Sequence, residues 1–113
     1  MGLFTGIGGI DTGRAVELLA SGEAVALDVR ERYEWEAGHI GSALHIPLGE
    51  LTVRREELPR SKKIVAVCRT GSRSGAATQA LRRAGCEVEN LSGGLVAWVR
   101  AGLPLDPPDG SVI

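Results

Sequence analysis

The segment VAVCRTGSRSGAATQALRRAG, which runs from Val65 to Gly85, changes its pattern at Cys68. Within the segment KIVAVC, the four residues before Cys68 form an uninterrupted apolar run, Ile-Val-Ala-Val, which is typical of a strand buried on both faces. A short loop of Arg, Thr, Gly and Ser follows, and residues 73–84 then carry small and apolar side chains at helical spacing. The segment therefore predicts a buried strand, a loop and a helix, with Cys68 at the carboxyl end of the strand.

The rest of the chain repeats this alternation of short apolar runs and helical patterns. Strands are expected at residues 24–29, 42–46 and 86–91, and helices at residues 12–20, 31–38, 48–59 and 93–102. Because strands that alternate with helices form parallel sheets covered on both faces, we expect a small α/β fold with a central parallel sheet. Functional sites in such sheets form at the carboxyl ends of the strands, where Cys68 is expected to lie.

The length and composition indicate one globular domain. The chain has 113 residues, of which 43% are hydrophobic and 24% are charged, and these values are ordinary for a domain with a single core. We expect a single domain over residues 1–113, with its core at about residues 10–105. Residues 106–113 contain Pro-Pro and Asp-Gly and are predicted to be a loose tail.

The sequence favours a cytoplasmic location. No apolar run approaches the ~18 residues of a membrane helix, and the N-terminus lacks a basic stretch followed by an apolar core. We therefore expect a cytoplasmic protein with no membrane partner. Its two cysteines, Cys68 and Cys86, are not expected to form a disulfide in that reducing compartment. No metal site is expected either, because the chain has no closely spaced pair of zinc ligands.

The net charge of the chain is −1, but the charges are unevenly distributed. Residues 51–83 contain nine Lys and Arg and two Glu, whereas residues 1–50 contain three basic and eight acidic residues. One interpretation is that these side chains cover solvated helix faces. Another is that they create a local positive field around Cys68 that attracts small anions. Nucleic acid is not expected as a partner, because the chain as a whole is not basic.

The loop after Cys68 has the features of an anion-binding loop. Backbone N–H groups between a strand and a helix can turn inward around an anion, and the helix N-terminus adds a positive partial charge. Gly71 allows unusual backbone angles, and Arg69 and Arg73 add full charges. These features favour the thiolate, so Cys68 is predicted to be a nucleophile at neutral pH. The alternative is that Cys68 is only a small buried apolar residue at a strand end.

The spacing within the loop distinguishes between two chemistries. Cysteine phosphatases use C-x-x-x-x-x-R, whose loop surrounds a tetrahedral phosphate, whereas here Arg73 stands five residues after Cys68 and gives C-x-x-x-x-R. The shorter loop makes a smaller ring of N–H groups, in which a phosphate would fit badly. A single sulfane sulfur carried on Cys68 would fit well, so a phosphatase or an arsenate reductase is disfavoured.

Three motifs together resemble the single-domain rhodaneses, a family of sulfurtransferases. CRTGSRS resembles their six-residue active-site loop, ALDVRERYEWEAGHIGSALHIP is similar to their LDVR…GHI…A…IP segment, and LSGGLVAWVRAGLP resembles their closing GG…W…G-P segment. The motifs stand in the family's order over about residues 10–105. The resemblance implies a small α/β fold with a central parallel sheet, and a reaction that needs no metal and no organic cofactor.

The resemblance also implies a reaction in two steps. Cys68 would attack the outer sulfur of thiosulfate and release sulfite, and the resulting persulfide would pass its sulfur to cyanide or a thiol. The persulfide would be held by the loop residues that follow Cys68, namely Arg69, Thr70, Gly71, Ser72, Arg73 and Ser74. The partners implied are a small anionic sulfur donor and a cyanide or thiol acceptor, or a protein that donates or accepts sulfur.

Other residues match the family motifs outside the loop. Asp28 and Arg30 fit the family's D-V-R just after a central strand and are expected to support the site. We interpret Arg30 as structural, bonded to a carboxylate such as that of Glu36. His39 could serve as a general base for the cysteine, but we interpret it as a residue that packs at a helix end or in a loop. Cys86 is expected in the core, with a resolving thiol as the alternative.

Three functions remain open on the sequence. The first is an enzyme, a thiosulfate sulfurtransferase, and the second is a sulfur-relay protein that takes persulfide from another protein and hands it on. The third is a rhodanese-like interaction module without catalysis. Such modules usually lack the cysteine, whereas this chain retains Cys68 and both loop arginines.

Overall fold

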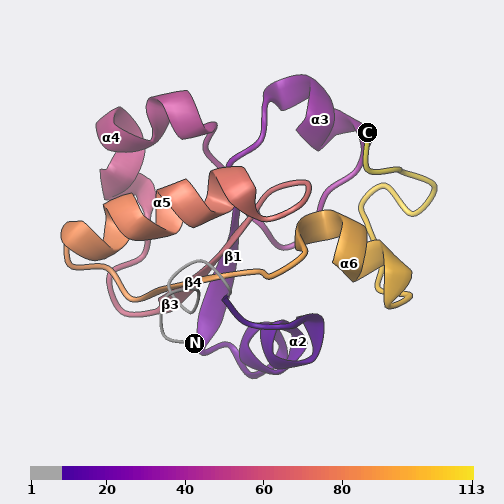
Figure 1. Cartoon of the computed structure of the whole chain (residues 1–113), viewed down its shortest axis with the longest axis horizontal. Helices are drawn as coiled ribbons and strands as arrows, with labels where there is room; N and C mark the ends of the chain where they lie inside the picture. The colour runs from indigo at the N-terminus through magenta and orange to yellow at the C-terminus, as the bar shows by residue number, and fades with distance from the viewer. Residues whose placement is uncertain (1–8) are drawn as a thin grey trace.

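The computed structural model describes residues 9–113, which form one parallel sheet of four strands. The strands are β1 (Ala24–Asp28), β2 (Leu44–His45), β3 (Lys63–Val67) and β4 (Val88–Asn90). Their spatial order is β2-β1-β3-β4, so the two longest strands, β1 and β3, are neighbours in the centre (Figure 1). Because every pair is parallel, all four carboxyl ends lie at one edge of the sheet. The central parallel sheet expected from the sequence is confirmed.

Helices cover both faces of this sheet (Figure 1). The helices α2 (Thr12–Ser21) and α6 (Gly94–Arg100) pack on one face, and α5 (Ser72–Arg83) and the short α4 (Leu51–Arg54) pack on the other. A further helix, α3 (Arg32–Ala37), follows β1 and lies beyond the carboxyl end of that strand. Over residues 9–113, no helix is long and apolar enough to cross a membrane.

The central strands build two cores because their successive side chains point to opposite faces. In β3, Val65 and Val67 pack in the cluster that contains Trp98 of α6, whereas Ile64 and Ala66 pack in the cluster beneath α4 and α5. These four strand residues are each at most 1% exposed. A strand covered on both faces needs an apolar residue at every position, which explains the uninterrupted run before Cys68.

Some elements are shorter or more broken than their sequence patterns. The strand expected at residues 42–46 is only Leu44–His45, and both β2 and β4 lie at edges of the sheet, where a strand has one neighbour instead of two. The helix expected at residues 48–59 is instead a 3₁₀ turn η1 (Leu48–Glu50), α4 and a second 3₁₀ turn η2 (Arg55–Glu57). Gly49 lies at this break. Glycine loses more conformational entropy on folding than other residues do, and this loss weakens a continuous helix.

The C-terminal segment packs against the chain around Gly38, in contrast to the loose tail expected for residues 106–113. Asp106 and His39 form an antiparallel bridge, with N–H···O distances of 2.7 and 3.1 Å. The N–H of Ser111 donates to the last carbonyl of α3 at 2.9 Å. A Cβ atom on Gly38 would lie 2.7 Å from the Ser111 carbonyl oxygen, so the approach depends on the missing side chain. Glycine here permits two backbone segments to pair.

Candidate active site

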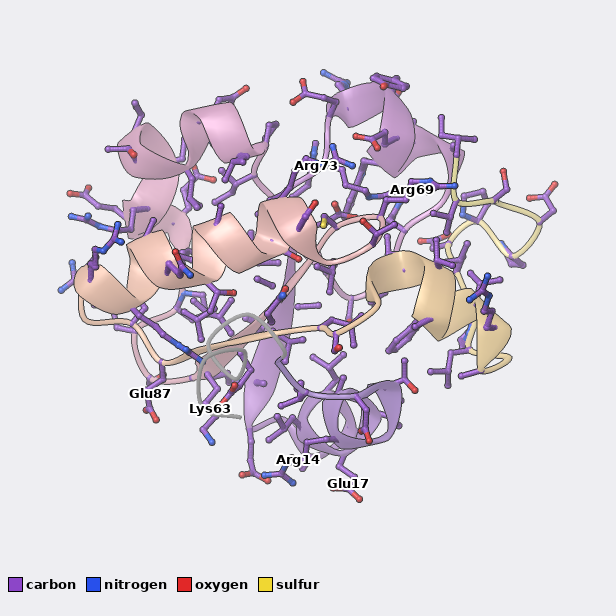
Figure 2. All side chains as sticks on the ribbon, viewed as in Figure 1. Arg14, Glu17, Lys63, Arg69, Arg73 and Glu87 are labelled. Atoms are coloured by element: carbon purple, nitrogen blue, oxygen red, sulfur yellow. The ribbon has the colours of Figure 1, made fainter. Side chains whose placement is uncertain are left out.

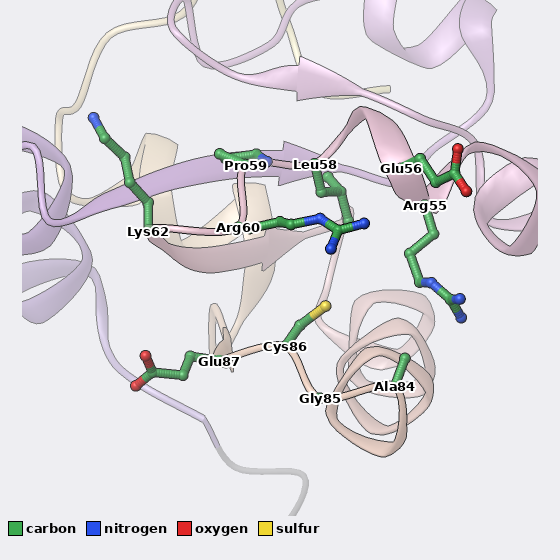
Figure 3. Close-up of a pocket in the computed structure, with 10 residues that line it drawn as sticks. All are labelled: Arg55, Glu56, Leu58, Pro59, Arg60, Lys62, Ala84, Gly85, Cys86 and Glu87. Atoms are coloured by element: carbon green, nitrogen blue, oxygen red, sulfur yellow. The ribbon is translucent and has the colours of Figure 1, made fainter.

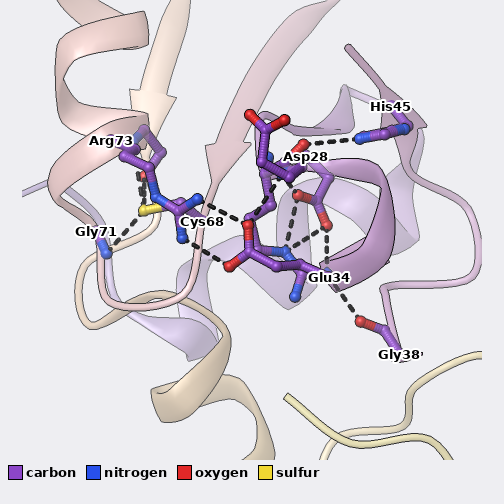
Figure 4. A network of polar contacts seen from close by, with 10 residues as sticks. Asp28, Glu34, Gly38, His45, Cys68, Gly71 and Arg73 are labelled. Atoms are coloured by element: carbon purple, nitrogen blue, oxygen red, sulfur yellow. Dashed lines mark hydrogen bonds and ion pairs between the residues drawn. The ribbon is translucent and has the colours of Figure 1, made fainter. Parts of the chain in front are cut away.

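Cys68 lies immediately after β3, at the start of the loop that leads into α5 (Figure 4). The residue is buried, with 1% of its surface exposed. Its Sγ atom accepts N–H bonds from Gly71 at 3.1 Å and from Ser74 at 3.3 Å, and the Ser74 hydroxyl lies 3.3 Å away as a further donor. The loop turns back on the sulfur because Gly71 adopts φ +108°, an angle that residues with a Cβ atom resist.

Two opposing effects act on the pKa of Cys68. Burial raises this pKa, because a low-polarity environment disfavours the charged thiolate. Hydrogen bonds from the Ser74 hydroxyl and from the N–H groups of Ser74, Gly71 and Thr70 lower it, and together they outweigh burial. The pKa of Cys68 therefore lies below that of an ordinary cysteine, which increases the fraction of nucleophilic thiolate at neutral pH.

Arg73 is held by an acidic residue that the sequence analysis did not single out. Its two terminal nitrogens donate to the two carboxylate oxygens of Glu34 in α3, at 2.8 and 2.9 Å (Figure 4). The ion pair with Arg73 lowers the pKa of Glu34 to about 2, against the opposing effect of burial. It also raises the pKa of Arg73. Arg73 also interacts electrostatically with Cys68, while its guanidinium is paired with the Glu34 carboxylate.

Arg69 is the loop arginine whose side chain is exposed and not paired with a carboxylate of residues 9–113. Within residues 9–113, its exposed side chain makes no hydrogen bond or ion pair, and it lies on the same side of the molecule as Arg73 (Figure 2). Its loop neighbours Thr70 and Ser72 are also exposed. Three of the nine basic side chains between residues 51 and 83 are paired with carboxylates: Arg54, Arg73 and Arg82. One third of these charges is therefore compensated, including that of Arg73, which leaves Arg69 as the uncompensated charge of the loop itself.

The start of α6 fixes the other side of the loop. The carbonyls of Cys68 and Arg69 accept hydrogen bonds from the N–H groups of Leu95 and Val96, at 2.9 and 3.0 Å. Gly94 allows this contact because it adopts φ +61°, and a Cβ atom built on it would lie 2.5 Å from the Arg69 carbonyl oxygen. The closing Gly-Gly motif thus positions the active-site loop by close backbone packing. With two carbonyls engaged by α6, N–H groups of the loop face the sulfur.

Asp28, the last residue of β1, forms a fully buried ion pair with Arg30, and the Nη2···Oδ2 distance is 2.8 Å. Arg30 also donates through Nε to the Asp28 carboxylate and through Nη2 to the Gly38 carbonyl at 2.8 Å. The interpretation of Arg30 as structural agrees with these contacts, but the suggested carboxylate was wrong. Glu36 pairs instead with Arg32 on the exposed face of α3, at 3.1 Å.

His39 packs at the end of α3, and within residues 9–113 its hydrogen bonds involve Trp35 and Asp106 and not the loop. Its ring stacks on Trp35, with centroids 3.5 Å apart and an interplanar angle of 7°. Its Nδ1 atom lies 2.7 Å from the Trp35 carbonyl oxygen, which can only accept, so Nδ1 carries the proton. The Nε2 atom lies 3.9 Å from a carboxylate oxygen of Asp106. These contacts support the packing role that we assigned to His39 and not that of a general base.

Cys86 lies at the opposite end of the sheet from Cys68. It is half-buried, precedes β4, and faces a pocket of about 410 Å³ that also contains Arg60 (Figure 3). Five residues of β3 separate the two ends of the sheet, which corresponds to ~16 Å at ~3.3 Å per residue. A disulfide requires Cα atoms within about 7 Å. Both cysteines are free, and Cys86 cannot act as a resolving thiol for Cys68 in the same folded chain.

The described residues around Cys68 do not form a metal centre. No group of three or more His, Cys, Asp or Glu side chains is placed to hold a metal ion over residues 9–113. The groups that surround Cys68 are hydrogen-bond donors, and such donors suit an electron-rich sulfur atom or a small anion.

Comparison with known proteins identifies the family. The model of the rhodanese-like domain matches residues 11–101, and the chain belongs to this family. A protein named sulfurtransferase from Allochromatium vinosum is 39% identical over 103 residues, which cover 89% of this chain and 96% of the relative. The motifs of the sequence had indicated this family, and the comparison confirms it, together with a sulfurtransferase activity at the level of the family.

Solved structures agree with this assignment. A rhodanese-related protein from Thermoplasma volcanium has a TM-score of 0.80 and 32% identity, and the match covers 86% of this chain and 95% of that one. A thiosulfate sulfurtransferase from Pseudomonas aeruginosa has a TM-score of 0.78 and 29% identity, with 89% of this chain and 20% of that one covered. Several curated relatives are longer than this chain, which spans between 39% and 61% of the length of three of them.

Proposed function

We propose that this protein transfers a sulfane sulfur from thiosulfate to cyanide or a thiol, and that it carries the sulfur as a persulfide on Cys68. The observation that carries the proposal is the set of donors around the buried sulfur, from Gly71 and Ser74 at 3.1 to 3.3 Å. These donors together stabilise the thiolate before the reaction, and the N–H donors stabilise the charged outer sulfur after it. The similarity to the thiosulfate sulfurtransferase from Pseudomonas aeruginosa supports thiosulfate as the donor.

The first step loads the cysteine. The Cys68 thiolate attacks the outer sulfur of thiosulfate, a new S–S bond forms, and the old S–S bond breaks as sulfite leaves with its electron pair. The exposed charge of Arg69 attracts the dianionic donor and stabilises the departing sulfite. Arg73, held by Glu34, keeps the loop closed behind the sulfur.

The second step transfers the sulfur from Cys68 to the acceptor. Cyanide or a thiolate attacks the outer sulfur of the persulfide, and the S–S bond to Cys68 breaks with the electron pair returning to Sγ. Thiocyanate or a new persulfide leaves, and the thiolate is again bound by the Gly71 and Ser74 donors. Neither step requires a metal or an organic cofactor. The cytoplasmic location also stays a prediction.

The experiment measures loading and turnover separately. Wild type, Cys68→Ser and Cys86→Ser are incubated with thiosulfate, and intact mass is recorded before cyanide is added and thiocyanate is assayed. A gain of about 32 Da and thiocyanate formation in wild type and Cys86→Ser, but not in Cys68→Ser, would support the proposal. A mass gain with little thiocyanate would indicate a relay protein with another acceptor. If folded wild type shows neither signal, thiosulfate is not the donor.

A further inference from the structure

Asn90 is a buried polar residue that contacts two parts of the loop from the end of β4. It is 1% exposed. Its Oδ1 atom lies 2.6 Å from the Ser74 hydroxyl oxygen, and its Nδ2 donates to the Gly71 carbonyl at 2.9 Å. Because a backbone carbonyl can only accept, the amide nitrogen must face Gly71 and the amide oxygen must face Ser74. The orientation of the Asn90 amide is therefore fixed by its neighbours.

The Ser74 hydroxyl has one proton but two neighbours that can accept it. Its oxygen lies 2.6 Å from Oδ1 of Asn90 and 3.3 Å from Sγ of Cys68. When Cys68 is a thiol, S–H can donate to the Ser74 oxygen while the hydroxyl donates to Asn90. When the thiol has lost its proton to solvent, Sγ can only accept. The hydroxyl must then turn to Sγ or leave its lone pairs facing a negative sulfur.

We propose that Asn90 is a positioning residue that sets the direction of the Ser74 hydroxyl according to the state of Cys68. The hydroxyl donates to Asn90 while Cys68 is a thiol or carries sulfur, and it donates to Sγ when Cys68 is a thiolate. Asn90 acts on the loop through its contacts with Ser74 and Gly71, and neither contact involves the sulfur. This inference rests on the proposed function for the persulfide state, whereas its thiol and thiolate states do not depend on it.

The neutral amide suits this role because its oxygen is a weak competitor for the proton. A hydrogen bond to a charged acceptor is roughly twice as strong as one between neutral groups. The Ser74 hydroxyl therefore donates to the Cys68 thiolate in preference to the Asn90 amide oxygen. A carboxylate at the same position would retain the hydroxyl. The charged groups around the loop, namely Arg69, Arg73 with Glu34, and the Asp28–Arg30 pair, are unchanged in every variant below.

The first test uses a chain with the native site. In Cys86→Ser, Cys68 is the sole cysteine, and its pKa is measured from the rate of alkylation by iodoacetamide against pH. The ¹³C shift of the Asn90 side-chain carbonyl is followed by NMR over the same range. We expect this shift to change with the pKa of Cys68, and the change to shrink at least twofold when Ser74→Ala is added. The proposal is overturned if the Asn90 carbonyl shift does not change as Cys68 titrates. It is also overturned if the shift changes by the same amount in the Ser74→Ala chain.

The second test replaces the amide oxygen with a stronger acceptor. In the Cys86→Ser chain, Asn90→Asp is expected to raise the pKa of Cys68 by about one unit, which lowers the alkylation rate ~10-fold below that pKa. Part of this shift comes from the new charge alone, so the substitution is repeated in Ser74→Ala. If Asn90→Asp acts through the Ser74 hydroxyl, it should raise the pKa of Cys68 clearly less in the Ser74→Ala background.

Equal shifts in the two backgrounds would mean that the aspartate acts by charge alone, and the proposal would be wrong. If Asn90→Asp does not fold, the NMR titration decides. Neither readout involves sulfur transfer, so failure of the proposed function and failure of this inference give different results.

Discussion

Glu34 and Arg73, which stand 39 positions apart in the chain, form a two-point ion pair of 2.8 and 2.9 Å. Glu34 lies in α3, after β1, and Arg73 lies in the first turn of α5, after β3. The pair therefore joins two elements that follow neighbouring strands, directly beside Cys68. It fixes the closing arginine of the loop, and it leaves Arg69 to attract an anionic donor.

The Glu34–Arg73 pair predicts a loss of stability in acid. The pKa of Glu34 is about 2 in the folded chain and near 4.5 in the absence of these contacts. A lowered pKa contributes stability above pH 4.5 that is lost as pH falls toward 2, when the carboxylate is protonated. The contribution is at most about 3 kcal/mol. Urea unfolding of wild type and Glu34→Gln between pH 2 and 7 measures it. The two free energies of unfolding should differ by a constant amount above pH 4.5, and the difference should shrink as the pH falls from 4.5 toward 2. A difference that does not change over this range would contradict the role of the pair.

The contact between α6 and the loop predicts a large effect of Gly94→Ala. This glycine has φ +61°, and the added Cβ would meet the Arg69 carbonyl oxygen at 2.5 Å. We expect a loss of more than 2 kcal/mol together with slower alkylation of Cys68, because the loop must shift. The matched control is Gly22→Ala, which also has positive φ, +81°, but open space around it. It should cost only about 1 kcal/mol and leave Cys68 unaffected.

The buried Asp28–Arg30 pair predicts strong coupling between its partners. Arg30→Met leaves the Asp28 carboxylate buried without its counter-charge, which should destabilise the chain by about 3 to 5 kcal/mol. Adding Asp28→Asn removes that uncompensated charge, so the double variant should be more stable than Arg30→Met alone. The exposed Arg32→Met, which breaks only the pair with Glu36, should change stability by less than about 1 kcal/mol. A double variant less stable than Arg30→Met would refute the coupling.

The exposed Arg69 leads to a prediction about binding of thiosulfate, the proposed donor. Arg69→Ala should raise the KM for thiosulfate several-fold at low salt, because the dianion loses the charge that attracts it. The difference should decrease at high ionic strength, which screens exposed charges. Arg83→Ala, at the far end of α5, removes the same charge from an exposed position away from the loop and should leave KM unchanged. Equal effects of the two variants would show that net charge alone matters.

The site-forming part of the fold could be predicted because its determinants are local. The apolar run before Cys68 needs no distant information to be recognised as a buried strand. The composition of the loop indicates a turn whose N–H groups face inward, as those of Gly71 and Ser74 do. The position of Cys68 at a carboxyl edge then follows from the parallel arrangement of alternating strands and helices.

The residues that support the loop could not be predicted, because they depend on contacts distant in the chain. Glu34 looks like an ordinary acidic residue of a short helix, and only the pairing of β1 with β3 brings it to Arg73. Asn90 ends an edge strand, and nothing in its local pattern indicates that it contacts the loop. The docked C-terminal segment was missed for a related reason: proline and glycine suggest a loose end until a backbone partner is known.

The hydrogen bonds from Leu95 and Val96 to the loop carbonyls have a consequence for how the reaction is driven. They orient the peptide dipoles around Cys68 during folding, with their positive ends toward the sulfur, before any donor arrives. In the proposed reaction, the charge at Cys68 changes from thiolate to persulfide and back. Water would have to reorient at each change, whereas these dipoles are already aligned. The environment would then need little reorganisation in either step, and α6 would contribute to the rate through the backbone of the loop.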